Sequence, residues 1–583
     1  MTDTNSSVDP VTLAVLRGRL EQIADEMDAT LFRSAFNPII AEAHDASHGL
    51  YDAATGDTLV QGKSGLPIFV GVMAFAVRAV IKKAADNDGP QHGDTWIFND
   101  PYDGGTHLSD FRLVRPVFRT SFKASKQSSD STKTAEERPP AEVFCYLASV
   151  GHWHDVGGNV PGNYNPAATE CFQEGMLIPP VRLFRHGELQ QDIVDILSAN
   201  SRLPNSLYGD LNGQINALDL GERRLHELLD EYGDDTVAAA LFELRERAAN
   251  LMRARIADLP NGTVSAEDYL DNDGIVDEPL KVALDLTVKD DRLLMDFSRS
   301  SVACAGPVNI SYSTTIAACY VALKHVFEDV PANAGVLEPV EFVVPDDSLL
   351  AVTAPKPVGG YTETILRLID VVFLAISQLV PERATACAYG TINALALNGH
   401  RANGQRWVMF SFFGGGHGAH ANGDGLNHGN APISTATIPP LEILEAAYPV
   451  MFRQWALRTD SGGEGKYRGG LGAVYEIELL EEFAQGFLFG ERGKYPPQGV
   501  VEGGTAACNV FSYEQSDGIA TPPMVSKLTG MVLQRGQAVK LETPGGGGYG
   551  NPAERNDASR QRDRELGYVS DHVAADNTPG QST

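Results

Sequence analysis

Two short segments of the chain carry histidine and aspartate side chains that could bind a transition metal. Each segment follows an apolar run, TWIFND or VFCYLASV, and each contains glycines that favour a loop. The side chains are His107 and Asp110 in NDPYDGGTHLSD, and His152, His154 and Asp155 in GHWHDVGG. Imidazole nitrogen and carboxylate oxygen are ligands that Zn²⁺, Mn²⁺ and Fe²⁺ accept. Spacing alone leaves a second interpretation open, in which these are polar loop residues that hydrogen-bond their own turns.

The stretch between the two segments gives a structural reason for them to meet. Residues 120–140 are rich in Ser, Thr, Lys and Glu and nearly free of apolar side chains, which predicts a solvated, mobile insertion. Without that insertion, His107 and His152 belong to two adjacent strands joined by a short turn. Residues where strands end and loops begin commonly carry chemistry. We therefore expect one cluster at the end of this strand pair.

Length, charge and hydropathy restrict the classes of partner. The 583 residues, 43% of them hydrophobic, exceed one ordinary domain and can form a large core. A formal charge of −30 argues against nucleic acid or an anionic membrane as partner, because phosphates would be repelled. No apolar run reaches the ~18 residues of a membrane span, and the polar N-terminus MTDTNSSVDP does not resemble a signal peptide. We expect a cytoplasmic protein whose six scattered cysteines stay reduced.

Hydrophobic periodicity predicts a mixed α+β fold. Apolar residues recur at helical spacing from Leu13 to Leu31, after a capping Asp9 and Pro10, which predicts an N-terminal helix with one buried face. The segment 41–52 then leaves this helix and ends as a strand. Further predicted elements are helices within 191–257, 313–328 and 363–380, a hairpin over 280–298 and short strands from 405 onward.

Changes in composition along the chain predict its organisation. One large domain is expected over residues 1–552, followed by a polar, partly disordered tail at 553–583. The domain divides into a metal-binding part, a mixed helical part and a β-rich C-terminal part. These three subdomains are expected at 1–190, 191–400 and 401–552.

Several motifs together resemble the hydantoinase B/oxoprolinase family over nearly the whole chain. The pattern NDPY-x-GGTH-x-x-D, followed by the later histidines and a double glycine, is accompanied by other segments in the family's order. These segments are DPVTLAVLRGRLEQIADEM (9–27), ATECFQEGMLIPPVRLFRHGEL (168–189), GDLNGQINALDLGERRL (209–225), GPVNIS (306–311), PGGGGYGNP (544–552) and GYVS (567–570). The family includes B subunits of ATP-dependent N-methylhydantoinases and lactamases, the C-terminal half of 5-oxoprolinase, and subunits of acetone and acetophenone carboxylases.

The resemblance implies a ligand set for a divalent transition metal (Zn, Mn or Fe). The residues that match the family's ligands are Asp45, His107, Asp110 and His152. The last three are also the expected catalytic residues. The family's usual His-His-x-Asp is His-Trp-His-Asp here, so the supporting role stays open between His154 and Asp155. For Asp45, an Asx-turn or a helix-exit cap is the alternative.

No nucleotide-binding signature accompanies the metal motifs. PGGGGYG (544–550) lacks the Gly-Lys-Ser/Thr of a Walker motif and is interpreted as a turn that closes the C-terminal region. The resemblance implies that ATP and Mg²⁺ are bound by a separate hydantoinase A-type subunit, in a hetero-oligomer such as A2B2. The partner would phosphorylate a poorly electrophilic amide or enol oxygen. The metal-bearing chain would then direct attack on the activated species, by an activated water in the hydrolytic case.

Other polar residues have an ordinary structural alternative beside a functional one. Glu174 could be a general base or a helix-surface or capping glutamate. Arg115 and Arg182 could bind an anionic group or form salt bridges. The glycine-rich segment 412–430, with His417, His420 and His428, is more simply a loop than a second metal site, and could line an active-site channel or a subunit interface.

Three functions follow as hypotheses. The leading one is a subunit of an ATP-dependent hydrolase that opens a small cyclic amide, namely a hydantoin, lactam or 5-oxoproline ring. The second is the corresponding subunit of an ATP-dependent ketone carboxylase. The third is a non-enzymatic assembly subunit with a structural metal, against which an exchangeable metal with an open coordination position would count.

Overall fold

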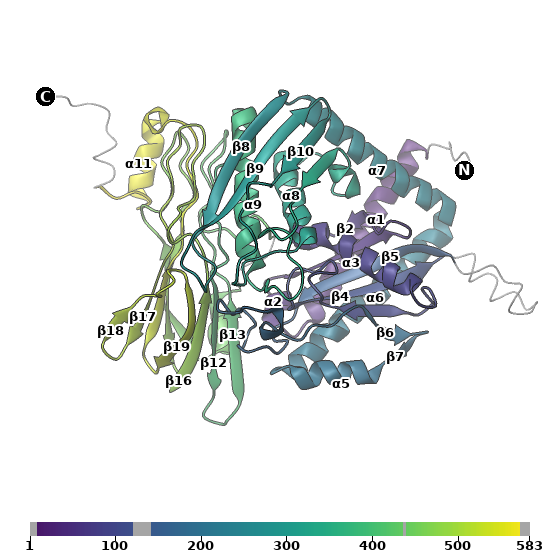
Figure 1. Cartoon of the computed structure of the whole chain (residues 1–583), viewed down its shortest axis with the longest axis horizontal. Helices are drawn as coiled ribbons and strands as arrows, with labels where there is room; N and C mark the ends of the chain where they lie inside the picture. Colours follow the sequence, from purple (N-terminus) through teal and green to yellow (C-terminus); the bar gives the residue numbers. More distant parts are fainter. Residues whose placement is uncertain (1–7, 120–141, 435–438, 572–583) are drawn as a thin grey trace, which may run out of the picture. The chain divides into compact units, whose positions relative to one another are not determined.

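The computed structural model describes residues 8–119, 142–434 and 439–571 of the chain (Figure 1). The chain divides into two units, each assembled from separate segments. Unit 1 comprises Met1–Val156, Met176–Ile256 and Phe327–Val340, and unit 2 comprises Gly157–Gly175, Ala257–Val326 and Glu341–Thr583. The segments of the two units interleave along the chain. The three consecutive subdomains expected at 1–190, 191–400 and 401–552 are a finer division, which stays a prediction. The insertion predicted at 120–140 lies outside the described residues.

Unit 1 is built on a seven-stranded sheet in the order β2-β1-β5-β4-β3-β6-β7, with all neighbours antiparallel. The strands are β1 (Ala46–Asp52), β2 (Thr58–Gln61), β3 (Thr95–Phe98), β4 (Asp110–Phe118), β5 (Val143–His152), β6 (Val181–Arg185) and β7 (Glu188–Leu189). Strands β4 and β5 pair along their whole length, from Asp110 opposite His152 to Phe118 opposite Val143. The prediction that the two metal motifs lie on adjacent strands is therefore confirmed.

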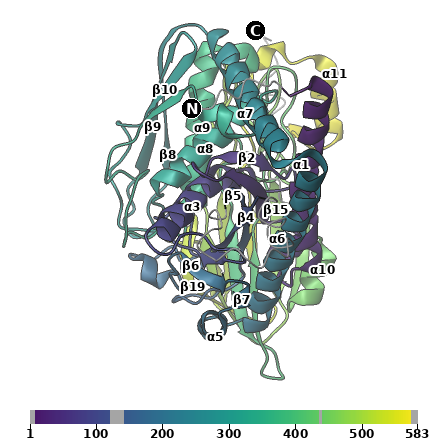
Figure 2. The same ribbon diagram turned by 90° about the vertical axis from the view of Figure 1, so that its right-hand side faces the viewer.

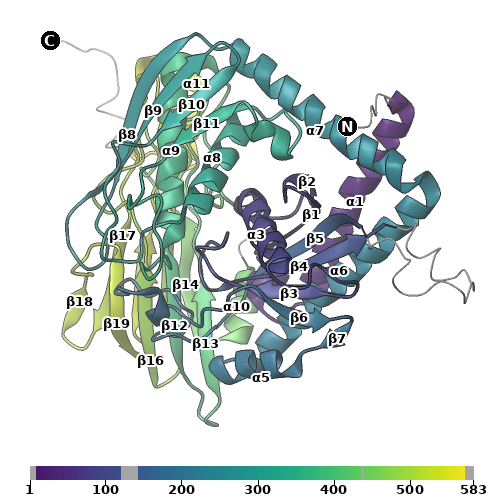
Figure 3. The same ribbon diagram turned by 45° about the vertical axis from the view of Figure 1, so that its right-hand side comes forward.

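Helices cover both faces of this sheet. The described helices of unit 1 are α1 (Pro10–Ser34), α2 (Pro38–Ala41), α3 (Pro67–Ala85), α5 (Gln191–Asn200), α6 (Pro204–Tyr232) and α7 (Asp234–Ala257). Helices α1 and α6 pack side by side against β1, β4 and β5, whereas α3 lies on the opposite face (Figures 2 and 3). The helix α1 begins as predicted, because the carboxylate of Asp9 accepts a hydrogen bond of 2.9 Å from the amide of Thr12.

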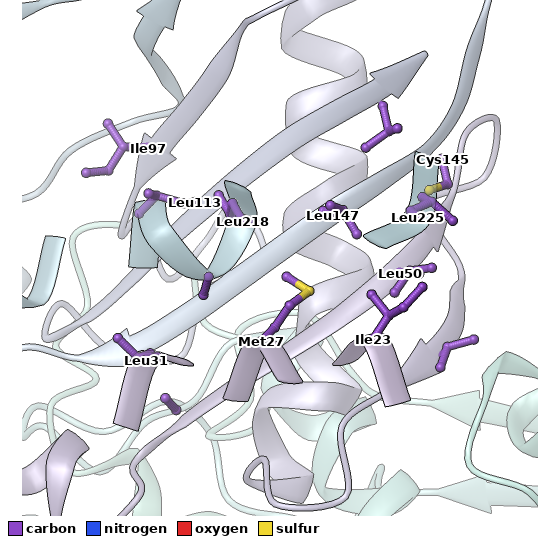
Figure 4. Close-up of a cluster of buried hydrophobic side chains, with 14 of the residues drawn as sticks. Ile23, Met27, Leu31, Leu50, Ile97, Leu113, Cys145, Leu147, Leu218 and Leu225 are labelled. Atoms are coloured by element: carbon purple, nitrogen blue, oxygen red, sulfur yellow. The ribbon is translucent and has the colours of Figure 1, made fainter. Parts of the chain in front are cut away.

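The core of unit 1 lies between α1, α6 and the sheet. Met27 and Leu31 of α1 project toward Leu113 and Leu147 of the sheet, together with Leu218 of α6 (Figure 4). The apolar side chains recur every three or four residues along both helices, so each helix buries one stripe against the sheet. This packing fixes the strands that carry the metal motifs.

Unit 2 contains three further sheets and two long buried helices. The sheet orders are β11-β10-β9-β8, β13-β12-β16-β19 and β14-β15-β20-β17-β18. The strands are β8 (Gly262–Leu270), β9 (Leu280–Lys289), β10 (Arg292–Asp296), β11 (Val340–Val343), β12 (Ala394–His400), β13 (Arg406–Ser411), β14 (Val450–Leu457), β15 (Ala473–Leu479), β16 (Phe483–Phe489), β17 (Val510–Gln515), β18 (Gly518–Ala520), β19 (Lys527–Gln534) and β20 (Ala538–Glu542). The helices are α8 (Tyr312–Val326), α9 (Tyr361–Leu379), α10 (Leu441–Ala447) and α11 (Asp557–Glu565).

These elements confirm the predicted α+β fold and its β-rich C-terminal region. The hairpin of β9 and β10 and the buried helix α9 also lie where the sequence predicts them. Helix α11 falls within the segment predicted as a polar tail, and its Asp563 pairs with Arg468 and Arg555. All six cysteines are free, and none of the helices in the described ranges is long and apolar enough to cross a membrane.

Glycine-rich segments far apart in sequence interlock inside unit 2. A Cβ atom added at Gly416, Gly470 or Gly546 would lie only 1.9 Å from a carbonyl oxygen of a neighbouring segment. Backbone hydrogen bonds join the same segments, for example from Gly546 to the carbonyl of Gly470 at 2.9 Å. The segment PGGGGYG is therefore not the turn that the sequence predicts. Its glycines allow backbone to pack directly on backbone.

Candidate metal centre

The predicted metal ligands gather at one end of the unit 1 sheet. Asp110 begins β4, His152 ends β5, and the two residues pair directly in register. His107 lies in the loop that leads into β4. Asp45 immediately precedes β1, whose first residue pairs with Gly151. Strands β1, β5 and β4 are antiparallel neighbours, so the start of β1, the end of β5 and the start of β4 lie at the same end of the sheet. All four candidates therefore lie at that end.

Three of these side chains converge closely. His107 Nε2 lies 3.0 Å from Asp110 Oδ1 and 3.2 Å from His152 Nδ1. The third side of the triangle, from His152 Nδ1 to Asp110 Oδ1, measures 3.1 Å. All three residues are buried.

The size of this triangle fits a bound transition metal. An octahedral ion about 2.1 Å from each ligand atom, with adjacent ligands at about 90°, holds those atoms about 3 Å apart, and a tetrahedral ion holds them about 3.4 Å apart. The three observed separations of 3.0, 3.1 and 3.2 Å lie within this range. Two imidazole nitrogens and a carboxylate oxygen are also the donor set that Zn²⁺, Mn²⁺ or Fe²⁺ accepts.

Asp45 lies beside the triangle without being part of its closest group. Its backbone carbonyl accepts a hydrogen bond of 3.1 Å from the amide of His152. Its Oδ1 is shielded from solvent and has no hydrogen-bond partner among the described residues, so the Asx-turn or cap alternative is not observed there. Burial raises the pKa of the Asp45 carboxyl to about 7; nearby His152 opposes this rise and Asp110 adds to it.

Two residues that the sequence did not single out hold the Asp110 carboxylate and its loop. Thr106 Oγ1 donates a short hydrogen bond to Asp110 Oδ2. The buried guanidinium of Arg112 donates to Thr106 Oγ1 and to the Asp110 carbonyl, each at 2.6 Å. Burial alone would raise the pKa of Asp110, but His107 and His152 beside it hold that pKa well below its usual range. These neighbours therefore favour the anionic form of the Asp110 carboxylate.

Comparison with known proteins shows the family to which this chain belongs. The profile of the hydantoinase B/oxoprolinase family matches residues 9–552. The chain belongs to this family. It is similar to the caprolactamase subunit beta of Pseudomonas jessenii, with 32% identity over 97% of this chain and 95% of that protein. It also matches the 5-oxoprolinase of Dictyostelium discoideum, with 28% identity over 94% of this chain and 40% of that longer protein.

Solved structures share the fold of this hydantoinase B/oxoprolinase family chain. The crystal structure of ATP-dependent caprolactamase from Pseudomonas jessenii matches with a TM-score of 0.86 and 31% identity, over 97% of this chain and 95% of that chain. A nucleotide-free structure of acetone carboxylase matches with the same TM-score of 0.86 at 20% identity, over 97% of this chain and 79% of that chain. At that lower identity, the second match shows a common fold.

Hydrogen bonds of the Asn99 and Asp100 side chains hold the loop that carries His107. The side chain of Asn99 donates to the carbonyls of Leu108 and Met176 at 2.7 Å and accepts from the amide of Ile178 at 2.7 Å. The carboxylate of Asp100 accepts from the amide of Tyr102 and shapes the turn that follows. The segment NDPY (99–102) therefore anchors the start of the loop that carries His107.

The two candidates for a supporting role differ in their contacts. The carboxylate of Asp155 forms an ion pair with Arg202 at 3.1 Å and accepts a hydrogen bond from the Arg202 amide at 2.9 Å. Asp155 thus joins the ligand segment to the residues just before α6. His154 is buried beside it, and its support of the centre stays a prediction.

The weaker candidates have structural partners. Glu174 is buried, and its carboxylate accepts hydrogen bonds from the amides of Val358 and Gly359 at 3.0 and 2.7 Å, so it is not a helix-surface residue. Burial raises the pKa of Glu174 to about 8, against the effect of these two bonds. Arg115 pairs with Asp219 and Glu222, and Arg182 pairs with Asp88 and Asp94.

Among the described residues, no group of three or more converging metal-ligand atoms includes a histidine of the segment 412–430. His417 contacts the carbonyl of Asn430, His428 contacts the hydroxyl of Tyr475, and His420 is exposed. Its glycines belong instead to the interlocked segments of unit 2. The simpler loop interpretation of the sequence fits this arrangement.

One other buried group in unit 2 has metal-ligand atoms within 4.8 Å of one another, namely Asp268, Asp370 and Cys387. The buried guanidinium groups of Arg367 and Arg492 pair with its two carboxylates, with Arg492 Nη1 2.9 Å from Asp268. Two arginines balance the charge of two aspartates, which leaves no net negative charge to attract a cation. This group is an internal ion-pair network.

Proposed function

We propose that this chain is the metal-binding B subunit of an ATP-dependent cyclic amidase that opens a hydantoin, lactam or 5-oxoproline ring. The observation that carries the proposal is the convergence of His107, Asp110 and His152 within 3.0–3.2 Å at the ends of two paired strands. The names of the relatives, a caprolactamase subunit and a 5-oxoprolinase, support the class of reaction.

His107, Asp110 and His152 would hold a divalent Zn, Mn or Fe ion, with Asp45, which immediately precedes the neighbouring strand β1, as the expected fourth ligand. Such an ion would polarise the reacting carbonyl and make a nearby water more acidic. The residues of the chain supply the rest. Asp110 provides negative charge, and Thr106 and Arg112 keep its carboxylate aimed at the histidines.

ATP would be bound by a hydantoinase A-type partner subunit. The relative from Pseudomonas jessenii is named a subunit beta, which supports a partner, and its crystal structure is that of an ATP-dependent caprolactamase. The glycine-rich segment PGGGGYG, the part of this chain that superficially resembles a phosphate loop, is packed against other backbone. Its amides donate to protein carbonyls, as Gly546 does to Gly470 and Gly547 does to Cys387. The working assembly would therefore be a hetero-oligomer such as A2B2.

The substrate class is tested with the complex of this chain and its ATP-binding partner. In the first assay, the complex receives ATP and a cyclic amide, and we expect ATP-dependent opening of a hydantoin, a lactam such as caprolactam, or 5-oxoproline. The ring-opened product is separated from the substrate and quantified. In a second assay, bicarbonate with acetone or acetophenone replaces the cyclic amide, and the complex and ATP are kept. Carboxylated product in that assay, with no ring opening in the first, would assign the chain to the carboxylase class.

Metal binding is tested by replacing His107 with alanine. We expect the wild-type chain to carry about one transition-metal ion per chain and His107→Ala to lose most of it, since one of three converging ligand atoms is removed. His420→Ala is the matched control, because that histidine is exposed in the glycine-rich loop. Elemental analysis of the purified proteins gives the readout, and full metal content in His107→Ala would contradict the site.

A further inference from the structure

Behind the candidate metal centre, helix α6 carries two fully buried polar residues one turn apart, Asp210 and Gln214. They lie in GDLNGQINALDLGERRL (209–225), a segment whose polar residues have no place in the reaction proposed above. Buried polar groups are costly unless they are hydrogen-bonded. Their partners therefore show what they do.

Gln214 lies on the face of the sheet opposite to the ligand side chains. Successive side chains of a strand point to opposite faces. Asp110 and His152 form one cross-strand pair, so the next pair, Phe111 and Gly151, faces the other way, toward α6. Gly151 has no side chain, and the amide of Gln214 lies beneath it, 3.6 Å from an added Cβ.

The side-chain amide of Gln214 connects Phe111, which follows Asp110, with Trp153, which follows His152. Gln214 Oε1 accepts a hydrogen bond of 2.9 Å from the indole of Trp153. Gln214 Nε2 donates to the carbonyl of Phe111 at 3.1 Å and to Ser149 Oγ at 3.2 Å. Phe111 and Trp153 also stack, with ring centroids 3.9 Å apart. The ends of β4 and β5 are thus tied to each other and to α6.

Asn37 makes a second connection, to His152 itself. Asn37 Nδ2 donates to the His152 carbonyl at 2.8 Å. Asp210 Oδ1 accepts from the amides of Phe36 and Asn37 at 2.8 and 3.1 Å, which places Asn37. The same Asn37 caps α2, because its Oδ1 accepts from the amide of Ile39 at 2.9 Å.

The network continues to α1. His48 Nε2 lies 2.9 Å from Ser149 Oγ, and His48 Nδ1 lies 2.7 Å from Asp28 Oδ1. His48 and Ser149 are a direct cross-strand pair of β1 and β5. Side chains from α1 and α6 therefore reach the backs of all three strands whose ends bear the candidate ligands.

We propose that Gln214 and Asn37 are positioning residues that hold the ends of β4 and β5 so that His107, Asp110 and His152 converge. This inference rests on the metal site proposed above. Neither residue takes part in the triangle of ligand atoms; each fixes the backbone of a ligand or of its neighbour. Partners that orient metal ligands typically contribute 10–100-fold to metal affinity.

The test titrates Co²⁺ into the full chain, in competition with a chelator, and records the visible absorption of the Co²⁺-loaded protein. Gln214→Met keeps a similar volume and removes three hydrogen bonds. Asn37→Ser keeps an oxygen that can cap α2 but loses the reach to the His152 carbonyl. We expect Co²⁺ binding to weaken ~10–100-fold in each variant, with shifted absorption bands that report altered ligand geometry.

Asn212→Ala is the matched control, since Asn212 lies on the same helix but is only partly buried and its side chain bonds only within that helix. It should bind Co²⁺ like the wild type. Wild-type affinity and absorption in both variants would overturn the positioning role and leave the metal site standing. A wild-type chain that binds no Co²⁺ would overturn the site and this inference together. If Gln214→Met does not fold, Asn37→Ser decides, with thermal unfolding measured alongside.

Discussion

Replacing His152 with alanine should reduce ATP-dependent ring opening by more than ~100-fold when the chain is assayed with its ATP-binding partner. Loss of a group that merely orients a metal ligand typically costs 10–100-fold, and His152 Nδ1 is itself one of the three converging atoms. Product formation from the cyclic amide gives the rate. The fold should survive, because His152 is the last residue of β5 and is not itself a member of the apolar core cluster.

The two stages of the proposed reaction make this result specific. Slow ATP cleavage by the partner should persist with His152→Ala, since phosphorylation and attack would occur on different chains. His420→Ala again serves as the control and should open the ring at the wild-type rate. Wild-type ring opening by His152→Ala would rule out the centre. Ring opening by the isolated wild-type chain without nucleotide would instead indicate a simple metallohydrolase.

Replacing Gly546 with alanine should destabilise the chain by at least ~4 kcal/mol, in the range of the most severe single substitutions. The added Cβ would lie 1.9 Å from the carbonyl oxygen and 2.1 Å from the carbonyl carbon of His417. Both atoms belong to buried backbone rather than to a side chain that could rotate away. Since folded proteins are stable by only ~5–15 kcal/mol, we expect little soluble protein. Chemical denaturation of any soluble fraction measures the loss.

Gly423→Ala is the matched control within the same glycine-rich part of unit 2. The nearest atoms to its added Cβ belong to the ring of His420, at 3.5 Å, which is an ordinary contact. This variant should fold with nearly wild-type stability. Equal stability of the two alanine variants would contradict the interlocked packing of backbone around Gly546.

The sequence predicts those features that are encoded locally. An N-terminal helix follows from the capping Asp9 and the apolar residues at helical spacing, and α1 has both. The buried helix α9 and the hairpin of β9 and β10 follow from continuous or alternating apolar runs in the same way. In each case, the atoms that decide the element lie within a few residues of one another.

Long-range contacts explain what the sequence did not reveal. Nothing in the sequence distinguishes Thr106 from other turn residues or Arg112 from other strand residues. Their contacts with Asp110 appear only in the structure. Glu174 looked like a possible base, but two amides more than 180 residues away bind its carboxylate. PGGGGYG looked like a turn because glycine permits turns, yet its glycines are needed where other segments approach.

For the candidate metal centre, residue types and spacing pointed to His107, Asp110, His152, His154 and Asp155, and the resemblance to the family then selected the first three together with Asp45. The residue types were informative because imidazole and carboxylate are ligands that transition metals accept, and the polar insertion between the two segments implied that their strands are paired. Only the tertiary structure brings Nε2, Oδ1 and Nδ1 to 3.0–3.2 Å, and only it places Gln214 and Asn37 behind them. The strand register and the packing of α6 set those distances. They depend on contacts between residues about 100 positions apart, which no local pattern records.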